Sequence, residues 1–375
     1  MIELNLSKYD RQVREAKVLY EITSRFEEPP RVPIAISTGP PYYCHLFGVN
    51  MREYYTDLDC QLEVQLKAIK WQFEVLQDDR EGYCISLDTG IIKEGLFFGC
   101  EISYPDNSTP YIIPMLETVN EIEALKIPDP ESHSKVQEVY RKVEQLRAKV
   151  KRMRLNIPVG GSFDIHPPLS AACAIMQPTL FYPLMIEEPD AAAFLLKKMY
   201  EAFCRLQDYH DRITGIKTTK LCLCDDNSAF ISNQMYRQFV YQYNLALYEK
   251  YGTEYRYLHA DGPNDQHFAM YANEFKLNRM DAGGFSNIEI AKRELGGKVV
   301  FSGGLNGREL YFRDLEQAKP SICRALRICA PGGGYIFAIG GETMPGIREK
   351  ALLDMVALVK KVGRYPIDLS ASGGS

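Results

Sequence analysis

The 375-residue sequence lacks a surplus of basic residues: 44 lysines and arginines stand against 49 aspartates and glutamates, a formal net charge of −5. Nucleic acids and anionic membranes are bound through basic surfaces, so both are excluded as partners. A long apolar run is also lacking, because the most apolar stretch, Ser170–Ile186, is broken by two prolines and is too short to span a bilayer. No signal pattern opens the chain, and we expect a cytoplasmic enzyme.

Paired cysteines are absent as well. The ten cysteines are scattered, and none belongs to a Cys-x-x-Cys motif. We expect them to be reduced and to lie mostly in the core, where a free thiol behaves as a small hydrophobic group. Cys222 and Cys224, two apart on one expected strand, are assigned to the core with the rest.

The sequence has no glycine-rich phosphate-binding turn after an early strand, which argues against a doubly wound sheet. It does have eight apolar segments that read as strands, and helical patterns alternate with them. The expected strands cover residues 31–37, 83–88, 155–159, 220–224, 255–261, 280–285, 298–302 and 334–339. The expected helices cover residues 6–25, 52–77, 118 onward, 132–153, 191–212, 232–252, 288–295, 310–329 and 345–362. This alternation predicts an α/β protein with a (β/α)8 TIM barrel.

The barrel accounts for most of the chain. We assign residues 1–30 to an N-terminal helical extension, 31–365 to a single (β/α)8 domain and 366–375 to a loose tail. Turn-rich residues around 105–110 predict a β-hairpin insertion after the second strand, at about 91–116. Residues 38–45 are expected to form a loop, and Asp190 is expected to cap the helix that follows it.

Active sites of such barrels lie at the carboxyl ends of the strands, where this sequence places many polar residues. His259 and Asp261 are two apart at a strand end, so they project to the same side before the chain turns at Gly262. We take these two, with Asp225 and Glu342, as catalytic candidates. The substrate-binding candidates are Tyr42, Tyr43, His45, Asp88, Asp164, His166, Asp226, Asn227 and Asn306.

Each candidate also has a purely structural interpretation. Residues 225–227 could cap the following turn, and His259 could be held by a backbone group while Asp261 serves the turn. Few of the candidates are basic, so the predicted site is acidic and polar and suits a polyanion poorly.

Four segments carry a recognisable pattern: residues 223–239, 258–262, 288–306 and 332–342. They resemble the uroporphyrinogen decarboxylase superfamily, which also contains corrinoid-dependent methyltransferases. Their order and spacing cover most of residues 30–365. The resemblance implies a (β/α)8 barrel, in agreement with the strand count.

Two departures from the family pattern point to a subfamily. True decarboxylases carry an arginine-rich N-terminal signature that clamps substrate carboxylates, whereas residues 34–45 contain no arginine. Thiol-methylating members bind zinc through His-x-Cys and a later cysteine. Here the histidine is His259, but Asp261 and Gly341 occupy the cysteine positions. The resemblance thus leaves open a zinc site made of His259, Asp261 and Glu342, or a metal-free site in which Asp261 or Asp225 transfers protons.

The resemblance implies a methyltransferase of the corrinoid-dependent branch. Its cobalamin, as methylcobalamin or cob(I)alamin, would come from a separate corrinoid protein, because the chain shows no Asp-x-His-x-x-Gly motif. The other substrate would be a small methylated compound of the methoxyaromatic type, or tetrahydrofolate. Two other hypotheses stay open: a decarboxylase acting on a smaller acid through Asp88 or Asp225, and a non-catalytic barrel that binds a partner or a tetrapyrrole. A homodimer is also left open.

Overall fold

The computed structural model describes residues 4–368, which divide into two compact units. The first unit comprises the chain up to Val49, Glu63–Tyr83 and the residues from Leu258 onward; the second comprises Asn50–Leu62 and Cys84–Tyr257. Most of the expected tail, residues 369–375, lies outside the described residues.

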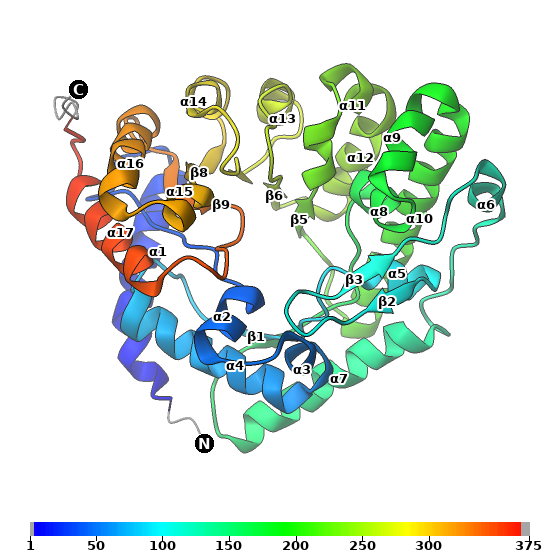
Figure 1. Cartoon of the computed structure of the whole chain (residues 1–375), viewed down its shortest axis with the longest axis horizontal. Coiled ribbons are helices and arrows are strands. Elements are labelled where there is room, and N and C mark those ends of the chain that lie inside the picture. The colour runs from blue at the N-terminus through cyan, green and yellow to red at the C-terminus, as the bar shows by residue number, and fades with distance from the viewer. Residues whose placement is uncertain (1–3, 369–375) are drawn as a thin grey trace. The chain divides into compact units, whose positions relative to one another are not determined.

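The first unit contains both ends of the described chain (Figure 1). Its elements are the 3-10 turn η1 (Leu6–Tyr9), α1 (Asp10–Ser24), α2 (Pro40–Phe47), most of α4 (Leu58–Trp71), the π-helical turn η2 (Gln72–Leu76), α13 (Phe268–Asn273), β7 (Arg279–Asp281), α14 (Ile288–Leu295), β8 (Val300–Asn306), α15 (Gly307–Phe312), α16 (Leu315–Cys329), β9 (Tyr335–Gly340) and α17 (Glu349–Val362). The helix expected over residues 6–25 is present as η1 and α1.

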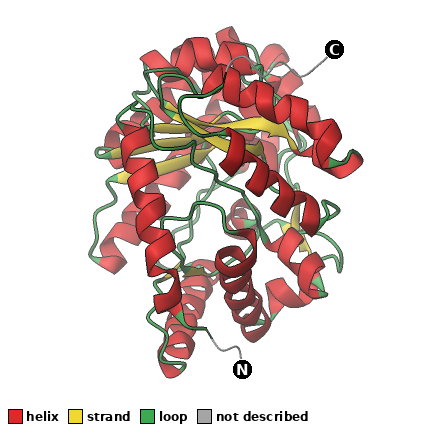
Figure 2. Ribbon diagram, turned by 90° about the vertical axis from the view of Figure 1, so that its left-hand side faces the viewer, coloured by secondary structure: helices red, strands yellow, loops and turns green. Residues whose placement is uncertain are grey.

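A parallel sheet forms the core of the first unit. β7 pairs with β8, and β8 pairs with β9 along six residues, from Phe301 opposite Tyr335 to Asn306 opposite Gly340. The first five residues of β9 are all buried, as expected for a strand that is covered on both faces. α14 and α16 pack beside β8, and Figure 2 shows helices flanking the strands.

The second unit is richer in helices. Its elements are α3 (Met51–Thr56), the start of α4, β1 (Ile85–Ser86), α5 (Lys93–Phe98), β2 (Glu101–Ser103), β3 (Tyr111–Ile113), α6 (Val119–Ala124), α7 (Ser134–Arg152), β4 (Val159–Gly160), α8 (Pro168–Ile175), α9 (Pro178–Glu187), α10 (Pro189–Thr214), β5 (Lys220–Cys224), the 3-10 turn η3 (Asp226–Phe230), α11 (Asn233–Phe239), α12 (Tyr241–Tyr251) and most of β6 (Tyr255–His259). Among the described residues, no single helix is long and apolar enough to cross a membrane; only the pair α8 and α9 passes that test together, bent by 115°.

Each of the eight expected strand segments contains at least one residue that pairs with another strand. The paired strands of the described residues do not, however, close into a barrel. The larger sheet has the order β5-β6-β7-β8-β9, whereas β1 and β4 form a separate parallel pair. The first expected strand is reduced to isolated bridges, one of them parallel, between Ile34 and Phe337. The expected hairpin is present as the antiparallel pair of β2 and β3, but residues 93–98, which were expected within the hairpin insertion, form α5 instead.

Several predicted boundaries were wrong for local reasons. Residues 40–47 form α2 and not a loop, because proline is favoured in the first turn of a helix, and α2 begins with two. The helix expected over 52–77 breaks at Asp57, whose Oδ1 accepts two amide hydrogens at the start of α4. Asp314 similarly caps α16 and separates it from α15. Asp190 lies inside the first turn of α10 and does not cap it.

Candidate functional site

His259, the last residue of β6, lies between two aspartates of the first unit. Its Nδ1 is 3.2 Å from Oδ2 of Asp281, and its Nε2 is 3.7 Å from Oδ2 of Asp261. Asp281 is largely buried, and its Oδ1 accepts the amide hydrogen of Gly283 at 3.1 Å. Asp281 therefore orients the imidazole ring and leaves Nε2 on the side of Asp261.

The sequence prediction omits Asp281. This residue ends β7 in the same way that His259 ends β6. The carboxyl ends of parallel strands share one edge of a sheet, so an acidic residue at the end of a short strand was a usable signal.

Asp261 lies in a turn whose backbone is fixed from inside. The fully buried side chain of Asn264 donates to the carbonyl oxygens of Ala260 and Asp261, at 3.1 and 3.0 Å. The turn also passes close to the end of β9, since a Cβ built on Gly341 would lie 3.1 Å from Oδ2 of Asp261. The carboxylate of Asp261 is therefore held beside His259 by main-chain geometry as well as by sequence proximity.

Glu342 approaches a different part of the first unit. A Cβ built on Gly39 would lie 1.3 Å from Oε1 of Glu342, so this carboxylate covers the glycine at the start of α2. The amide of Thr343 donates to the carbonyl of Ser37 at 2.8 Å and ties the two loops together. Only glycine at position 39 leaves room for the glutamate in this position.

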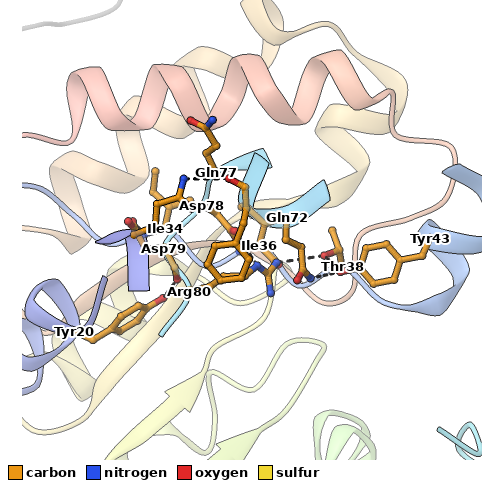
Figure 3. Close-up of polar contacts among 12 residues, drawn as sticks. Tyr20, Ile34, Ile36, Thr38, Tyr43, Gln72, Gln77, Asp78, Asp79 and Arg80 are labelled. Carbon is orange, nitrogen blue, oxygen red and sulfur yellow. Dashed lines mark hydrogen bonds and ion pairs between the residues drawn. The ribbon is translucent and has the colours of Figure 1, made fainter. Parts of the chain in front are cut away.

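A network of carboxylates holds the segment before α2 (Figure 3). Asp79 accepts the amide hydrogen of Ile34 at 2.8 Å, and Asp78 accepts that of Ile36 at 3.0 Å. Arg80 bonds both Asp78 and the carbonyl of Ile36, at 2.9 Å each. Burial raises the pKa of the Asp78 carboxyl, although its pairing with Arg80 opposes that shift. The segment is thus fixed through its backbone.

The tyrosines expected to bind substrate turn inward from α2. Tyr42 is 1% exposed and packs on Trp71 with ring centroids 5.8 Å apart, and burial raises the pKa of Tyr42 to about 12. Tyr43 is also buried, with its hydroxyl 2.5 Å from Oγ1 of Thr38 (Figure 3). His45 is exposed at the end of the helix. The structure does not bring these three side chains into one site.

Asn306 ends β8 and begins α15. Its Oδ1 accepts the amide hydrogen of Arg308 at 3.0 Å, so it serves as the N-cap of this helix. Its side chain is partly exposed, and a Cβ built on Gly284 would lie 3.2 Å from its Cα.

The second unit has its own pair of histidine and carboxylate, His166 and Glu94. Oε1 of Glu94 accepts hydrogen bonds from the backbone amide of His166 at 2.5 Å and from its Nδ1 at 2.6 Å. The Glu94 side chain is 1% exposed. Burial alone would lower the pKa of His166, but the charge and hydrogen bond of Glu94 outweigh it and raise that pKa to about 9. The Glu94 carboxylate therefore favours the imidazolium form of the His166 ring. Sequence reasoning identified His166 and missed Glu94, which lies 72 positions away in α5.

Asp164 and Asp88 are linked to the residue next to Glu94. Lys93 donates to Oδ1 of Asp164 at 2.5 Å, and the hydroxyl of Ser162 donates to the same oxygen at 3.0 Å. Asp88 accepts from the hydroxyl of Tyr54 at 3.2 Å, and its pKa is raised by burial although the charge of Lys93 opposes the shift. Hydrogen bonds thus position both aspartates, and the charge of Lys93 acts on both.

Asp225 is fully buried, and its carboxylate accepts hydrogen bonds from neighbouring side chains. Ser170 donates to its Oδ1 at 3.1 Å, while Tyr236 and Asn244 donate to its Oδ2 at 3.2 and 2.9 Å. Burial raises its pKa to about 6 even though these hydrogen bonds favour the charged form. Its backbone carbonyl accepts from Ser228. This geometry favours a role in positioning η3 over direct contact with a substrate.

The residues around Asp225 are more accessible. Oδ1 of Asn227 accepts a hydrogen bond from Tyr182 at 2.8 Å. Cys224 and Asp226 lie near enough to His166 for their charges to raise its pKa further. The end of β5 therefore faces the Glu94–His166 pair within the second unit.

The expectation that most cysteines lie in the core was wrong. Of the ten free cysteines, Cys44, Cys173 and Cys329 are buried, whereas Cys84 and Cys222 are exposed. On β5 it is Leu221 and Leu223 that pack inward, because residues two apart share a face and the leucines occupy the buried one.

Comparison with known proteins identifies the family. The family model described as "Uroporphyrinogen decarboxylase (URO-D)" matches residues 19–362. The chain belongs to the uroporphyrinogen decarboxylase family. The family fold is a TIM barrel, which agrees with the α/β architecture and the parallel strands described above.

Two known proteins that this chain is similar to carry different activities in their names. A uroporphyrinogen decarboxylase of Helicobacter pylori (strain Shi470) is 22% identical over 283 residues, which cover 73% of this chain and 78% of that protein. A methyltransferase from Methanosarcina mazei has a similar structure, with a TM-score of 0.65 and 17% identity, covering 92% of this chain and 98% of the other. The second likeness concerns the fold.

This member of the uroporphyrinogen decarboxylase family has no free arginine clamp in the segment before α2. Residues 34–45 hold no arginine, and Arg80, which reaches the segment, is bonded to Asp78 and to the carbonyl of Ile36. Arg31 is likewise bonded to both carboxylate oxygens of Asp79, at 2.6 Å each. Substrate carboxylates would have to compete with these aspartates.

The first-unit residues partly fit a zinc ion. Two ligands at about 2 Å from one tetrahedral ion lie roughly 3.3 Å apart, and Nε2 of His259 lies 3.7 Å from Oδ2 of Asp261. The bond from Nδ1 of His259 to Asp281 is the outer support that metal-binding histidines usually have. Among the residues described, Glu342 does not join this pair within 4.8 Å. The pair therefore fits two ligand positions, and Glu342 does not supply a third.

Proposed function

We propose that this family member is a methyltransferase that moves a methyl group between a small methylated substrate, or tetrahydrofolate, and the cobalamin of a separate corrinoid protein. The observation that carries the proposal is Asp261, held beside Nε2 of His259 at the position where thiol-methylating relatives have a cysteine. An oxygen ligand or acid at this point suits an oxygen- or nitrogen-linked methyl group better than a thiol. Similarity to a superfamily methyltransferase is consistent with this proposal.

Chain residues would orient the substrate and manage its charge. Asp281 keeps the His259 ring in one orientation, and Asp261 would hydrogen-bond a polar group of the substrate and exchange a proton with it. If His259 and Asp261 hold zinc, the ion would supply Lewis-acid polarisation of that polar group. The acidic residues of the first unit, Asp261, Asp281 and Glu342, make a substrate with several carboxylates a poor fit.

A direct assay tests the proposal. Purified protein is mixed with free cob(I)alamin and with methoxyphenols, methylamines or methyltetrahydrofolate in separate reactions, and methylcobalamin is followed by its absorbance. We expect methyl transfer from at least one donor class, above the rate without protein. Absence of transfer from all three classes would contradict the proposal.

A parallel assay addresses the decarboxylase alternative, which the Helicobacter relative favours. Release of carbon dioxide from small aromatic or pyrrole acids is measured with the same protein. Decarboxylation without methyl transfer would replace the proposed function. Asp88 is then the candidate acid, because Asp225 is fully buried.

Elemental analysis separates the two versions of the site. A zinc content near one per chain, lost together with activity in His259→Ala, supports the metal-assisted version. A content near zero in an active preparation supports the version in which Asp261 transfers the proton.

A further inference from the structure

The Glu94–His166 pair joins α5 to the loop between β4 and α8. α5 begins at Lys93 without a side-chain cap, and His166 lies in a loop between β4 and α8. A buried carboxylate with one partner is costly unless its charge is balanced. Here the balance comes from His166, since Oε1 of Glu94 takes both bonds from that residue and Oε2, also buried, has no hydrogen-bond partner among the described residues.

The pairing leaves one nitrogen of the ring available. Nδ1 is bound to Glu94, so Nε2 is the nitrogen that can act on another molecule. The side chain of His166 is 29% exposed, which gives this nitrogen access to solvent or substrate. The other charged groups near it are Cys224 and Asp226, and the pair Lys93–Asp164 lies beside it in the same loops.

Every nearby acidic group favours the same protonation state. Glu94, Cys224 and Asp226 all stabilise the imidazolium, and Lys93 is neutralised by Asp164 at 2.5 Å. The result is a fixed proton donor in the second unit, in contrast to a neutral histidine that would act as a base.

We propose that His166, kept protonated by Glu94, donates a proton from Nε2 to the oxygen that loses its methyl group, so that the methyl donor is an ether with a basic leaving oxygen. This inference rests on the proposed methyl transfer. The bond between the methyl carbon and the oxygen breaks, and its electron pair stays on the oxygen. The reduced corrinoid supplies the pair for the new bond to carbon. The proton on Nε2 converts the oxygen to a hydroxyl, and neutral His166 regains a proton from solvent. His166 is then catalytic and Glu94 is a positioning residue.

The test compares methyl donors whose leaving oxygens differ in basicity. A donor whose oxygen leaves as a basic phenolate, such as 2-methoxyphenol, needs the proton, whereas 4-nitroanisole releases a weakly basic phenolate and does not. We expect His166→Gln and Glu94→Gln to slow single-turnover methyl transfer to cob(I)alamin from 2-methoxyphenol by about 100-fold. With 4-nitroanisole the loss should be less than about tenfold. Equal losses with both donors would overturn the proposal, since they would indicate a structural or general binding role.

A measurement without turnover tests the role of Glu94 alone. Histidine ring resonances are followed by NMR over a pH series, and His166 is assigned among the six histidines by its loss in His166→Gln. We expect His166 to titrate near pH 9 in the wild type and at least one pH unit lower in Glu94→Gln. Glu138→Gln, which removes a half-buried carboxylate of the same unit that is paired with Lys142, is the matched control and should leave the titration unchanged.

The two measurements separate the possible failures. Titration of His166 at an ordinary value in the wild type would overturn this inference whatever the activity. An abnormal titration in a protein that transfers no methyl group from any donor would overturn the proposed function and, with it, the acid role of His166. Should Glu94→Gln fail to fold, the donor comparison in His166→Gln still decides the question.

Discussion

The two units pair a histidine with carboxylates in different ways. In the second unit, Glu94 is almost completely buried and binds His166 at 2.6 Å through a single oxygen. In the first unit, His259 is shared between Asp281 at 3.2 Å and the more exposed Asp261 at 3.7 Å. The first arrangement favours a charged ring, and the second orients a ring and has a carboxylate beside its other nitrogen. The difference suggests a dedicated proton donor in one unit and a ligand or acid–base pair in the other.

The largest expected effect comes from removing the exposed carboxylate of the first-unit pair. Asp261→Ala should lower methyl transfer by about 1000-fold, within the range for loss of an acid–base group, while the melting temperature changes little. Asp354→Ala, an exposed carboxylate of α17 paired with Lys350, is the matched control. Wild-type rates in Asp261→Ala would mean that Asp261 serves only the turn.

The second prediction concerns the stability of the protein and Asp225, a buried carboxylate that is not paired with a histidine. Asp225 has a pKa raised to about 6 in the folded chain, against about 4 when unfolded. Between these values the folded state keeps a proton that the unfolded state has lost, so the free energy of unfolding should fall as pH rises from about 4 to about 6, by roughly 1–3 kcal/mol. Chemical denaturation over this pH range, compared with Asp225→Asn, measures the contribution. The same slope in both proteins would contradict it.

A smaller effect is expected for the orienting residue of the first-unit pair. Asp281→Asn keeps the size of the side chain and a hydrogen-bonding oxygen but removes the charge next to Nδ1 of His259. Outer support of this kind is typically worth about 10- to 100-fold in activity or metal affinity, and we expect a loss near the lower end. Steady-state rates and zinc content should be measured together. If the variant matches the wild type in both rate and zinc content, Asp281 has no role in orienting His259 for the reaction.

The smallest effect is expected from displacing the side chain of Glu342 by a substitution at Gly39. Gly39→Ala would place a methyl group where Oε1 of Glu342 lies, and the glutamate can swing away at little cost to the fold because it is the end of a flexible chain. We expect a severalfold loss of activity and a change in unfolding free energy below about 1 kcal/mol. An unchanged rate would indicate that the position of Glu342 does not matter for turnover.

Much of the fold follows from the sequence, because its strongest signals are local. The segment at 220–224 is a strand with the predicted bounds, the strand expected over 255–261 ends two residues early at His259, and Ile288–Leu295 is the predicted helix. Their apolar residues and flanking caps act over a few positions. Errors occurred where one residue type has two uses, as with Pro40, which begins a helix although proline was taken as a loop signal.

The candidate site was less predictable, because its key contacts join distant segments. His259 and Asp261 could be paired from strand alternation alone, and the structure places them 3.7 Å apart. Glu94, by contrast, reaches His166 across 72 positions from a segment expected to be a strand of the hairpin, where α5 forms instead. Nothing in the local pattern around residue 94 distinguishes a buried carboxylate from a surface one.

The paired aspartates below the segment before α2 have a consequence for how this protein can diversify. Asp78 and Asp79 hold residues 34 and 36 by their amide hydrogens, which every residue except proline possesses. These backbone contacts therefore do not depend on which side chains the segment carries, although Ile34 and Ile36 are themselves buried in the core. The exposed His45, at the end of α2, should therefore accept most substitutions without loss of stability, which thermal melts of a saturation library at this position would measure.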